Sequence, residues 1–381
     1  MESVECTLSL NNGVMLGWKM IEIDGSMGEG GGQVLRTSLA LAAILRREVR
    51  IFNIRAGRAE PGLKAQHLTS VKAVTEICGA SSKGLQVGST EFIFTPGVLK
   101  AGSFRFDVGT AGSITLVLQS LMPMLPFTPG TVELEITGGT DVKWSPPIDY
   151  LRLVTLPLLE RMSVHASILV LRRGHYPRGG GVVRVTATPV SVLKNIVGKE
   201  GGDVIAITGV SHSVKLPIRV AETQASAVTR VIERKSFPRP KIEIDASENN
   251  THLGPGSGIV LCATTSKGGV LGADSLGERG RPAEVVGEDA AKKLLEELGS
   301  GAFLDRHMGD MIVPYAALAE GVSDVSLSQV TLHTVTNVKV AEQAAGVQFD
   351  PLPQVGMPGR LRVKGLGLKR AEVSVSPREL S

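Results

Sequence analysis

A glycine-rich segment is the part of this sequence best suited to hold a charged ligand. Residues 28–32, Gly-Glu-Gly-Gly-Gly, follow a strand-like segment and precede a helix-like one. Glycine lets backbone amides turn toward a ligand, and the N-terminus of a helix favours an anion. The segment matches neither the P-loop, which needs Gly-Lys-Ser/Thr, nor the spaced GxGxxG of dinucleotide folds. On this pattern alone, a tight structural turn and an anion site are equally good interpretations.

Polar and basic side chains close to this segment suit the binding of phosphate. Gln33 and Arg36 fall in the first turn of an otherwise apolar helix, where a buried guanidinium needs a partner anion. Arg55 and Arg58 end a strand, and Gln66 follows at the start of the next helix. Guanidinium groups bind phosphate oxygens in a bidentate manner. We therefore expect a phosphate clamp here, with three solvated surface arginines as the alternative.

Two histidines are further candidates for chemistry. His333 lies in a strand-like run, and an imidazole is a competent nucleophile near neutral pH when a neighbour fixes its tautomer. A histidine in an alternating strand is more often a hydrogen-bonded structural residue. His307 lies three residues before Asp310, so the two side chains can share one face of a helix. That spacing is weak evidence for a metal site, and the sequence has no HExxH motif or nucleophile elbow.

The composition excludes several classes of protein. The chain has 381 residues, of which 42% are hydrophobic, 20% charged and 4% aromatic, which predicts a globular protein of two or three domains. No apolar run reaches the ~18–20 residues of a membrane helix. Three distant cysteines give no reason to expect disulfides or structural zinc, so we expect a cytoplasmic protein. The net charge of +4 permits an anionic ligand without requiring one.

Secondary-structure patterns recur along the chain. Three units, at about 20–100, 103–187 and 271–347, each mix strands with two helices. They predict an α/β (α+β) fold whose main body is three repeats of a βαβαβ-type unit. Residues 188–270 break the pattern and contain their own strands and helix. We expect them to form a small α/β domain inserted between the second and third repeats.

Individual elements within the units follow from local periodicity. The first unit opens with a strand at 20–24 and an apolar helix at 34–45. A second helix is expected from Pro61, which suits a first helical turn, and a strand at 85–87. In the third unit, residues 330–338 alternate as a strand does.

Seven segments, in this order, make the sequence similar to the RNA 3′-terminal phosphate cyclases. They are IDGSMGEGGGQVLRTSLAL, IRAGRAEPGLKAQHLTSVKA, GTAGSITLVLQSLMPML, GGTDVKWSPPIDYL, HYPRGGGVV, GPGSGIVL and HTVTN. They cover the chain from about residue 20 to about residue 347. Residues 1–19 precede the usual start of the family, and we interpret them as an N-terminal extension or as the result of a different start codon. Residues 348–381 form a basic C-terminal tail, rich in Pro and Gly, to which we assign no function.

The resemblance implies an ATP-dependent, ligase-type enzyme that converts an RNA 3′-terminal phosphate to a 2′,3′-cyclic phosphodiester. In this family a histidine attacks the α-phosphorus of ATP, expelling pyrophosphate and forming a covalent histidine–AMP. AMP then passes to the RNA 3′-phosphate to give RNA-pp-A, and the vicinal 2′-hydroxyl closes the ring as AMP leaves. The family nucleophile lies in the HxxTN segment, which makes it His333 in this sequence. ATP and the RNA 3′-phosphate end are thus the implied partners.

The resemblance also implies roles for other residues. The family's contact to a divalent metal, Mg²⁺ or Mn²⁺, matches Glu29. His307 carries no catalytic role, and Met311 stands where relatives often have Gln. The residues that match the nucleotide and phosphate site are Gln33, Arg36, Arg55, Arg58, Gln66, His307 and Asp310.

Two other functions are alternatives. A cyclase-like branch acts in ribosome biogenesis as a non-cyclising RNA-binding protein and lacks the nucleophilic histidine, so His333 favours the enzyme. Enolpyruvyl transferases are also built from repeated α/β units and also hold phosphate with arginines, but they form no covalent nucleotide. With few aromatics, base-stacking platforms are not evident, so we expect RNA contacts mainly to phosphate. The sequence does not determine the oligomeric state.

Overall fold

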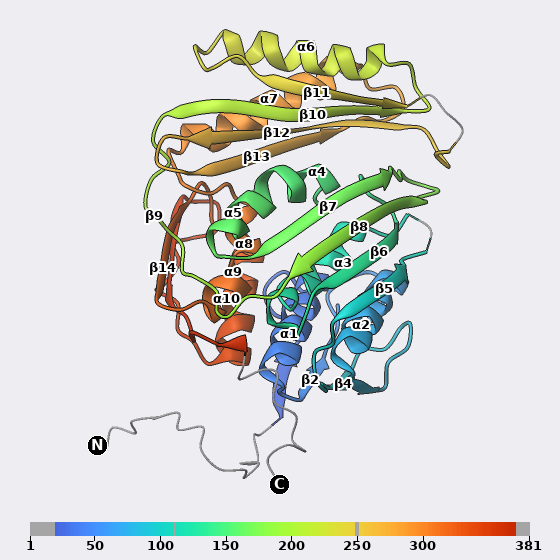
Figure 1. Ribbon diagram of the computed structural model, residues 1–381, viewed down its shortest axis with the longest axis vertical. Helices are drawn as coiled ribbons and strands as arrows, with labels where there is room; N and C mark the ends of the chain where they lie inside the picture. Colours follow the sequence, from blue (N-terminus) through green and yellow to red (C-terminus); the bar gives the residue numbers. More distant parts are fainter. Residues whose placement is uncertain (1–19, 110, 248–250, 371–381) are drawn as a thin grey trace.

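The protein is a mixed α/β molecule built on four small sheets, as the computed structural model shows (Figure 1). The structure describes residues 20–109, 111–247 and 251–370. The expected N-terminal extension and the end of the C-terminal tail lie outside these residues. Every sheet combines a parallel pair of strands with antiparallel ones. The predicted α/β class is therefore confirmed, whereas the threefold repeat stays a prediction.

The first sheet has the strand order β1-β2-β4-β3, and two helices connect its strands. β1 and β2 are parallel, and the other two pairs are antiparallel. A helix connects each of the first two strands to the next strand in the chain. In chain order the elements are β1 (Ile21–Asp24), α1 (Gly32–Leu45), β2 (Val49–Phe52), α2 (Ala65–Cys78), β3 (Ser81–Lys83) and β4 (Phe92–Thr95).

The second sheet repeats this arrangement with the order β5-β6-β8-β7, and its strand directions are the same. Its second helix is interrupted by a π-helical stretch, η2, and β8 is a strand that the sequence pattern did not reveal. The elements are β5 (Gly102–Asp107), α3 (Ile114–Leu121), η1 (Leu125–Phe127), β6 (Val132–Gly138), α4 (Ile148–Tyr150), η2 (Leu151–Thr155), α5 (Leu156–Arg161), β7 (His165–Arg172) and β8 (Gly181–Thr188).

A third sheet has the order β15-β14-β9. β15 lies in the expected C-terminal tail and pairs with β14, so that part of the tail belongs to the folded body. The elements are β9 (Val197–Gly198), α8 (Met308–Met311), α9 (Val313–Leu318), β14 (Val322–Leu327), α10 (Leu332–Ala345) and β15 (Gly359–Lys364).

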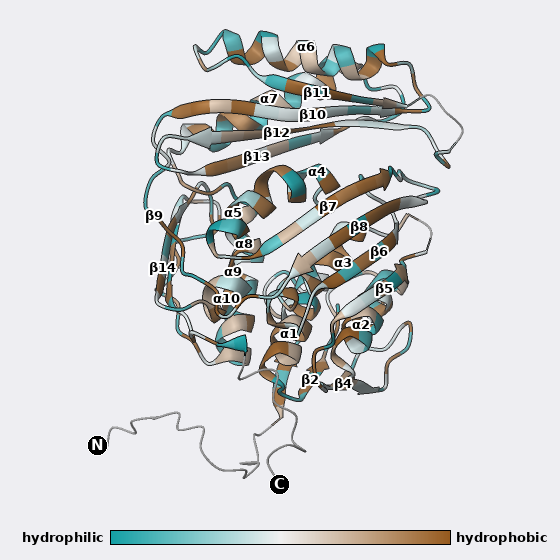
Figure 2. Cartoon of the chain, viewed as in Figure 1, coloured by the Kyte–Doolittle hydropathy of each residue, from teal (hydrophilic) through white to brown (hydrophobic). Residues whose placement is uncertain are grey.

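The fourth sheet, β11-β10-β12-β13, forms one end of the molecule (Figure 1). Helices α6 and α7 pack against each other and against β12, and α6 mixes hydrophilic and hydrophobic residues along its length (Figure 2). This layer extends past residue 270, where the inserted domain was expected to end. The elements are β10 (Val204–Val214), α6 (Arg219–Glu233), β11 (Lys241–Ser247), β12 (Gly256–Thr265), β13 (Val270–Leu276) and α7 (Ala283–Gly299).

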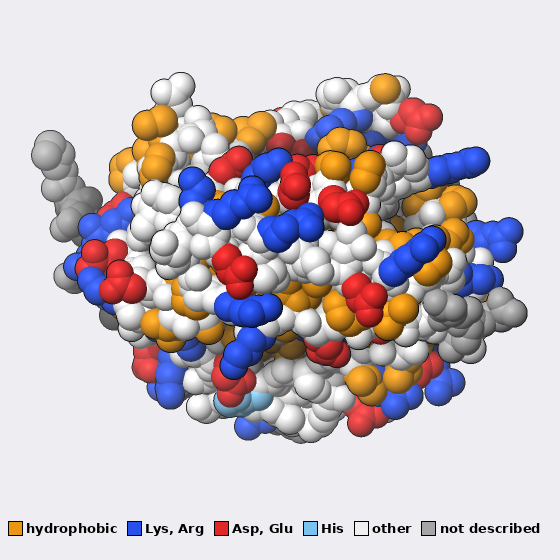
Figure 3. Space-filling model, turned by 90° about the horizontal axis from the view of Figure 1, so that it is seen from above, with side chains coloured by type: hydrophobic (Ala, Val, Ile, Leu, Met, Phe, Trp, Pro, Cys, Tyr) orange, Lys and Arg blue, Asp and Glu red, His pale blue; other side chains and the backbone are white. Residues whose placement is uncertain are grey.

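Charged side chains on this end of the molecule are mixed in sign. Acidic and basic groups lie interspersed with hydrophobic ones where the view in Figure 3 shows described residues. A surface that holds nucleic acid through its phosphates carries clustered basic residues instead. This face therefore gives no electrostatic reason to place RNA on it.

Helix α1 lies at the centre of the core. Residues 33–44 are all buried, and the helix packs against α10, α3 and α2. Polar residues in such a helix must find partners inside the protein, because burying them unpaired is unfavourable. Although α1 is apolar, it has only 14 residues, and no helix in the described ranges is both long and apolar enough to cross a membrane.

The strand predicted at 330–338 is wrong, because residues 332–338 form the start of α10. Thr331 is the N-cap, and its hydroxyl accepts a hydrogen bond from the backbone N–H of Thr334 at 3.0 Å. The alternating β-branched residues suggested a strand, but a capping box and buried positions at helical spacing, Val338 and Ala341, favour the helix. His333 therefore lies in the first turn of a helix.

Two smaller predictions also differ from the structure. Helix α2 begins at Ala65 rather than at Pro61, because Gly62 takes φ +80° and keeps the preceding chain non-helical. The strand expected at 85–87 lies at 81–83. Glycines with positive φ on both sides of 85–87 bend this segment into the turn that leads to β4.

The buried carboxylate of Asp305 joins three elements, and its removal tests this part of the core. It accepts hydrogen bonds from the Tyr150 hydroxyl at 2.6 Å and from the backbone N–H groups of Gly272, His307 and Met308 at 2.7–2.9 Å. Asp305→Ala leaves several buried donors unpaired and should lower the free energy of unfolding by about 3 kcal/mol or more.

Tyr150→Phe is the matched control because it removes one of these bonds and leaves the carboxylate paired by backbone amides. It should cost about 1–2 kcal/mol. Urea unfolding of both variants measures the difference. Equal losses of unfolding free energy in the two variants would contradict the conclusion that the Asp305 carboxylate holds several elements together.

Candidate functional site

The N-terminal ends of α1 and α10 meet at the glycine-rich turn 28–32. A Cβ added to Gly28, which has φ +63°, would lie 2.0 Å from the Thr336 hydroxyl oxygen. That hydroxyl accepts the backbone N–H of Glu29 at 3.1 Å. A Cβ on Gly32, the first residue of α1, would lie 2.7 Å from Nε2 of His67, near the start of α2. Three helix N-termini therefore converge, and each carries partial positive charge.

His333, Glu29 and Arg58 form the exposed part of this site. His333 Nδ1 lies 3.7 Å from Glu29 Oε1, and the His333 side chain is 48% exposed. Arg58 forms an ion pair with the Glu29 carboxylate and donates a hydrogen bond to the Glu29 carbonyl at 3.0 Å. Glu29 is thus held from one side, while the imidazole stays accessible to a ligand.

A hydrogen-bonded chain of polar side chains runs inward from Arg36. The Arg36 guanidinium donates to Gln33 Oε1 at 2.5 Å, and Gln33 Nε2 donates to Asn337 Oδ1 at 3.0 Å. The Thr37 hydroxyl donates to the same Asn337 oxygen at 2.6 Å. Asn337 Nδ2 donates to the backbone carbonyl of Asp310 at 2.8 Å. Arg36 Nε has no partner among the described residues, so this buried cation still has a donor to offer an anion.

The burial of the site shifts the pKa values of its groups. Burial lowers the pKa of Arg36 to about 10, with Glu29 and Asp310 opposing the shift, so Arg36 stays charged at neutral pH. Burial also lowers the pKa of His333, and positive neighbours add to this effect while Glu29 opposes it. Burial, followed by nearby cations, lowers the pKa of His67 to about 4. Both imidazoles are therefore neutral at pH 7.

Two of the predicted phosphate-site residues hold loops in this structure. Arg55 Nη1 donates to the carbonyls of Glu60 and Gly62 at 2.8 and 3.1 Å, while its positive charge reaches the site and lowers the pKa of a nearby imidazole. Gln66 Oε1 accepts the backbone N–H of Ser113 at 3.2 Å, which ties α2 to the start of α3. The structure thus places both residues beside the site, with their polar groups partly engaged.

His307 and Asp310 approach the site from α8. His307 immediately precedes α8, is exposed, and contacts the Tyr150 ring edge-to-face at 6.2 Å between ring centroids. Its charge acts on the pKa values of both Asp310 and His333. Asp310 Oδ1 is buried without a partner in the described part of the chain. Burial raises the pKa of Asp310 to about 7.

A small cavity of about 30 Å³ continues from the polar chain toward the interior. Gln119 lies in its wall, donates to Met311 Sδ at 3.3 Å and leaves its own Oε1 without a partner in the described ranges. Sequence reasoning missed Gln119, Thr37 and Asn337 as site residues, because single polar residues in apolar helices give little signal. The residues that line the cavity are Gln33, Thr37, Gln119, Met122, Pro123, Leu151, Thr155, Asp310, Met311, Pro314, Tyr315 and Asn337.

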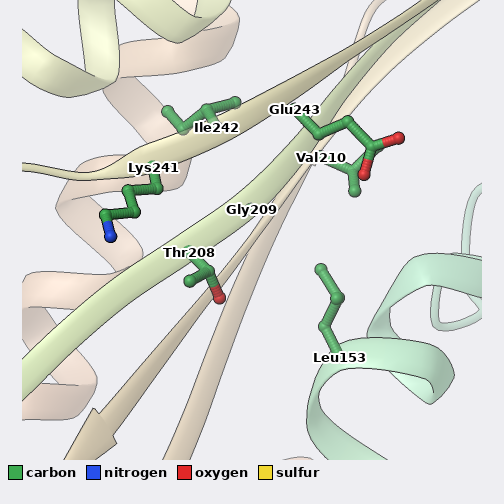
Figure 4. Close-up of a pocket in the computed structure, with 7 residues that line it drawn as sticks. All are labelled: Leu153, Thr208, Gly209, Val210, Lys241, Ile242 and Glu243. Atoms are coloured by element: carbon green, nitrogen blue, oxygen red, sulfur yellow. The ribbon is translucent and has the colours of Figure 1, made fainter.

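A larger groove of about 540 Å³ opens elsewhere, between η2 and strands β10 and β11 (Figure 4). Leu153 faces the sheet from η2, and Glu243 and Val210 lie on the opposite side. None of the predicted site residues lines this groove. Size alone therefore does not identify the functional site in this protein.

The fold and the site together define an α/β protein with an accessible, neutral imidazole beside buried and exposed arginines, a combination suited to a phosphorylated ligand. Residues 27–350 match the family model described as RNA 3′-terminal phosphate cyclase. Three similar proteins have that name. The protein of Ignicoccus hospitalis is 51% identical over 92% of this chain and 100% of its own length, and that of Hyperthermus butylicus 52% over 92% and 99%. That of Methanopyrus kandleri is 48% identical over 91% and 99%. The chain belongs to the RNA 3′-terminal phosphate cyclase family.

The pH dependence of stability tests the environment of Asp310. The pKa of about 7 in the folded protein lies above the ordinary value of 3.8, so the folded state binds this proton more tightly. The stability that Asp310 contributes is therefore complete below about pH 4 and declines as the pH rises through 7. Asp310→Asn should remove this decline.

Urea unfolding of wild type and variant at pH 5 and pH 7.5 measures the effect. The variant should gain stability relative to wild type as the pH increases. Parallel pH profiles would show that Asp310 is ionised and paired in the folded protein.

Proposed function

We propose that this protein converts an RNA 3′-terminal phosphate to a 2′,3′-cyclic phosphodiester, using ATP and a covalent histidine–AMP intermediate. The observation that carries the proposal is the accessible, neutral imidazole of His333 beside Glu29, at converging helix N-termini. Curated relatives about half identical over nearly their whole length are named for this activity.

In the first step, His333 Nε2 attacks the α-phosphorus of ATP. Glu29 lies beside Nδ1, which favours the tautomer with the proton on Nδ1 and a lone pair on Nε2. A bond forms between Nε2 and phosphorus, and the bond from phosphorus to the bridging oxygen breaks. Pyrophosphate leaves with the electron pair of that bond. A neutral imidazole at pH 7 is the form that can make this attack.

Positive charge around the triphosphate stabilises the charge that develops on the leaving pyrophosphate. Arg36 is a buried cation with an unpaired Nε, and Arg58 lies against Glu29 at the entrance. In a partly buried site such donors act in a lower dielectric than water, and the loss of one costs about 2–4 kcal/mol of transition-state stabilisation. We assign Gln33, Arg55 and Gln66 to the same phosphate-binding region.

A divalent metal fits beside Glu29. Mg²⁺ and similar ions are commonly held by one or two carboxylates together with substrate phosphates and water, and Glu29 provides such a carboxylate. When bound, the ion would neutralise charge on the triphosphate. Arg58, paired with the same carboxylate, holds Glu29 in position for this contact.

In the remaining steps, AMP moves from His333 to the RNA. A terminal 3′-phosphate oxygen attacks the phosphorus of the histidine–AMP, and the P–N bond breaks, which restores the imidazole and gives RNA-pp-A. The 2′-hydroxyl oxygen then attacks the RNA phosphorus, its proton is lost, and AMP leaves. AMP is a better leaving group than the oxide of a phosphate dianion, which is why the activation is needed. We place His307 and Asp310 near the nucleotide.

We also propose that the body consists of three repeats, two of them at about 20–100 and 103–187. The third repeat was predicted at 271–347 and the inserted domain at 188–270; we propose that the insertion continues through α7 to Gly299 and that the third repeat begins after that residue. The shared strand order and directions of the first two sheets support this arrangement. The fourth sheet and its two helices support a separate layer between β9 and α8. We propose a cytoplasmic location.

The covalent intermediate is the decisive test of this function. The full chain is incubated with α-labelled ATP and Mg²⁺ without RNA, then denatured and examined for label. We expect acid-labile, alkali-stable AMP on the wild type and none on His333→Ala, because the P–N bond requires this imidazole.

His307→Ala is the matched control and should keep the label, because His307 lies at the same site without a catalytic role. Label on His333→Ala but not on His307→Ala would retain the class of enzyme and assign the nucleophile to His307. A folded wild type without label would favour the non-catalytic, RNA-binding branch.

Salt dependence tests how the RNA is held. Contacts mainly to phosphates predict that log K falls with log salt by about 0.7 for each neutralised phosphate of a single strand. With a few contacts, binding of a 3′-phosphorylated oligonucleotide should weaken about tenfold between 50 and 200 mM salt. Fluorescence anisotropy with uridine-rich and adenosine-rich oligonucleotides measures this. A flat salt profile, or strong preference for one base, would contradict phosphate-dominated contacts.

A further inference from the structure

Three buried side chains outside the ATP site bring possible metal-ligand atoms together. Asp141, His175 and His212 each offer one ligand atom, and these atoms all lie within 4.8 Å of one another. All three side chains are at most 6% exposed. Asp141 follows β6 and His175 follows β7, whereas His212 lies in β10 of the fourth sheet. The cluster therefore joins the second sheet to the fourth.

The donor atoms of this cluster face one another. His175 Nε2 and His212 Nε2 are 3.0 Å apart, and Asp141 Oδ2 lies 3.9 Å from His212 Nε2. Asp141 Oδ1 is buried and has no hydrogen-bond partner among the described residues. Two imidazole nitrogens and a carboxylate thus converge, and the two rings share only one hydrogen bond. A cation can accept all of these lone pairs together.

Neighbouring polar groups hold the same Asp141 oxygen that faces His212. Asp141 Oδ2 accepts hydrogen bonds from the Thr140 hydroxyl at 2.6 Å and from Arg173 Nη1 at 3.2 Å. Arg173 also pairs with Asp149 and Asp245, each at 2.7 Å. Arg152 also forms an ion pair with Asp149. The network thus contains two guanidinium groups and three carboxylates, so it retains negative charge around Asp141. This charge favours a cation beside Asp141.

The backbone of β12 fixes the position of both imidazole rings. A Cβ on Gly256 would lie 2.1 Å from Cγ of His175, and a Cβ on Gly258 would lie 3.0 Å from Cε1 of His212. Both glycines belong to the GPGSG segment, and His175 and Asp141 belong to the HYPRGGG and GGTD segments. Three motifs that the ATP chemistry does not use therefore meet at this cluster.

We propose that Asp141, His175 and His212 bind one divalent transition-metal ion of the zinc class. Two imidazoles and one carboxylate are a donor set suited to Zn²⁺, whereas Mg²⁺ and Ca²⁺ prefer oxygen ligands alone. A water molecule is the candidate for a fourth ligand. The ion joins the second sheet to the fourth and so stabilises the contact between them.

Co²⁺ provides a direct probe, because its visible absorption reports a four-coordinate site. The full chain is stripped with a chelator and titrated with Co²⁺ and then with Zn²⁺. We expect one equivalent of Co²⁺ with a tetrahedral spectrum, loss of that spectrum when Zn²⁺ displaces it, and a higher Tm with Zn²⁺. His175→Gln and His212→Gln should each weaken the binding by more than about tenfold.

Two control variants separate this site from others. Glu29→Ala should keep the Co²⁺ spectrum, because Glu29 belongs to the ATP site, and His165→Gln should also keep it, because His165 is an exposed histidine outside the cluster. A spectrum lost in Glu29→Ala, or retained in both cluster variants, would overturn the proposal. A wild type that takes up no stoichiometric Co²⁺ or Zn²⁺ would show that the two rings only share a hydrogen bond.

If the cluster variants do not fold, X-ray absorption of the Zn²⁺-loaded Glu29→Ala protein decides the question. Scattering from two imidazole rings in the first shell would support the proposal. A shell of oxygen ligands alone would overturn it.

Discussion

The hydrogen-bonded chain of polar side chains between α1 and α10, here called the polar seam, is the interaction on which the rest of the site depends. Gln33, Arg36 and Thr37 lie in the buried part of a mostly apolar helix, and Asn337 in α10 pairs with two of them. An unpaired polar group in this core would cost about 1–3 kcal/mol. The polar seam therefore allows one register of the two helices. That register brings the first turn of α10, which contains His333, to the glycine-rich turn 28–32.

The helix ends create an environment that makes an imidazole reactive. Partial positive charge from converging N-termini, together with Arg36 and Arg58, attracts phosphate and disfavours a protonated ring. Glu29 opposes this effect and orients His333 through Nδ1. The same positive charges that suit a phosphate ligand therefore also keep His333 in its neutral form.

The fourth sheet depends on a different set of polar contacts. Its junction with the second sheet contains a buried ion-pair network around Arg173 and the cluster of Asp141, His175 and His212. Breaking one member of such a network is strongly unfavourable, because it leaves another charge buried without a partner. The contacts that attach this layer and those that surround His333 thus involve separate groups of residues.

Contiguous motifs by themselves determined the family, the apolar character of α1 and the residues around Glu29, because glycine turns and helix starts are local features. Local pattern failed at 330–338, where β-branched residues suggested a strand but the Thr331 cap and packing on α1 produced a helix. Only the tertiary structure decided that Asn337 completes the Arg36 seam and that His175 meets His212. The two members of each pair are distant in the sequence. Local periodicity therefore cannot predict which buried polar groups will form hydrogen bonds with one another.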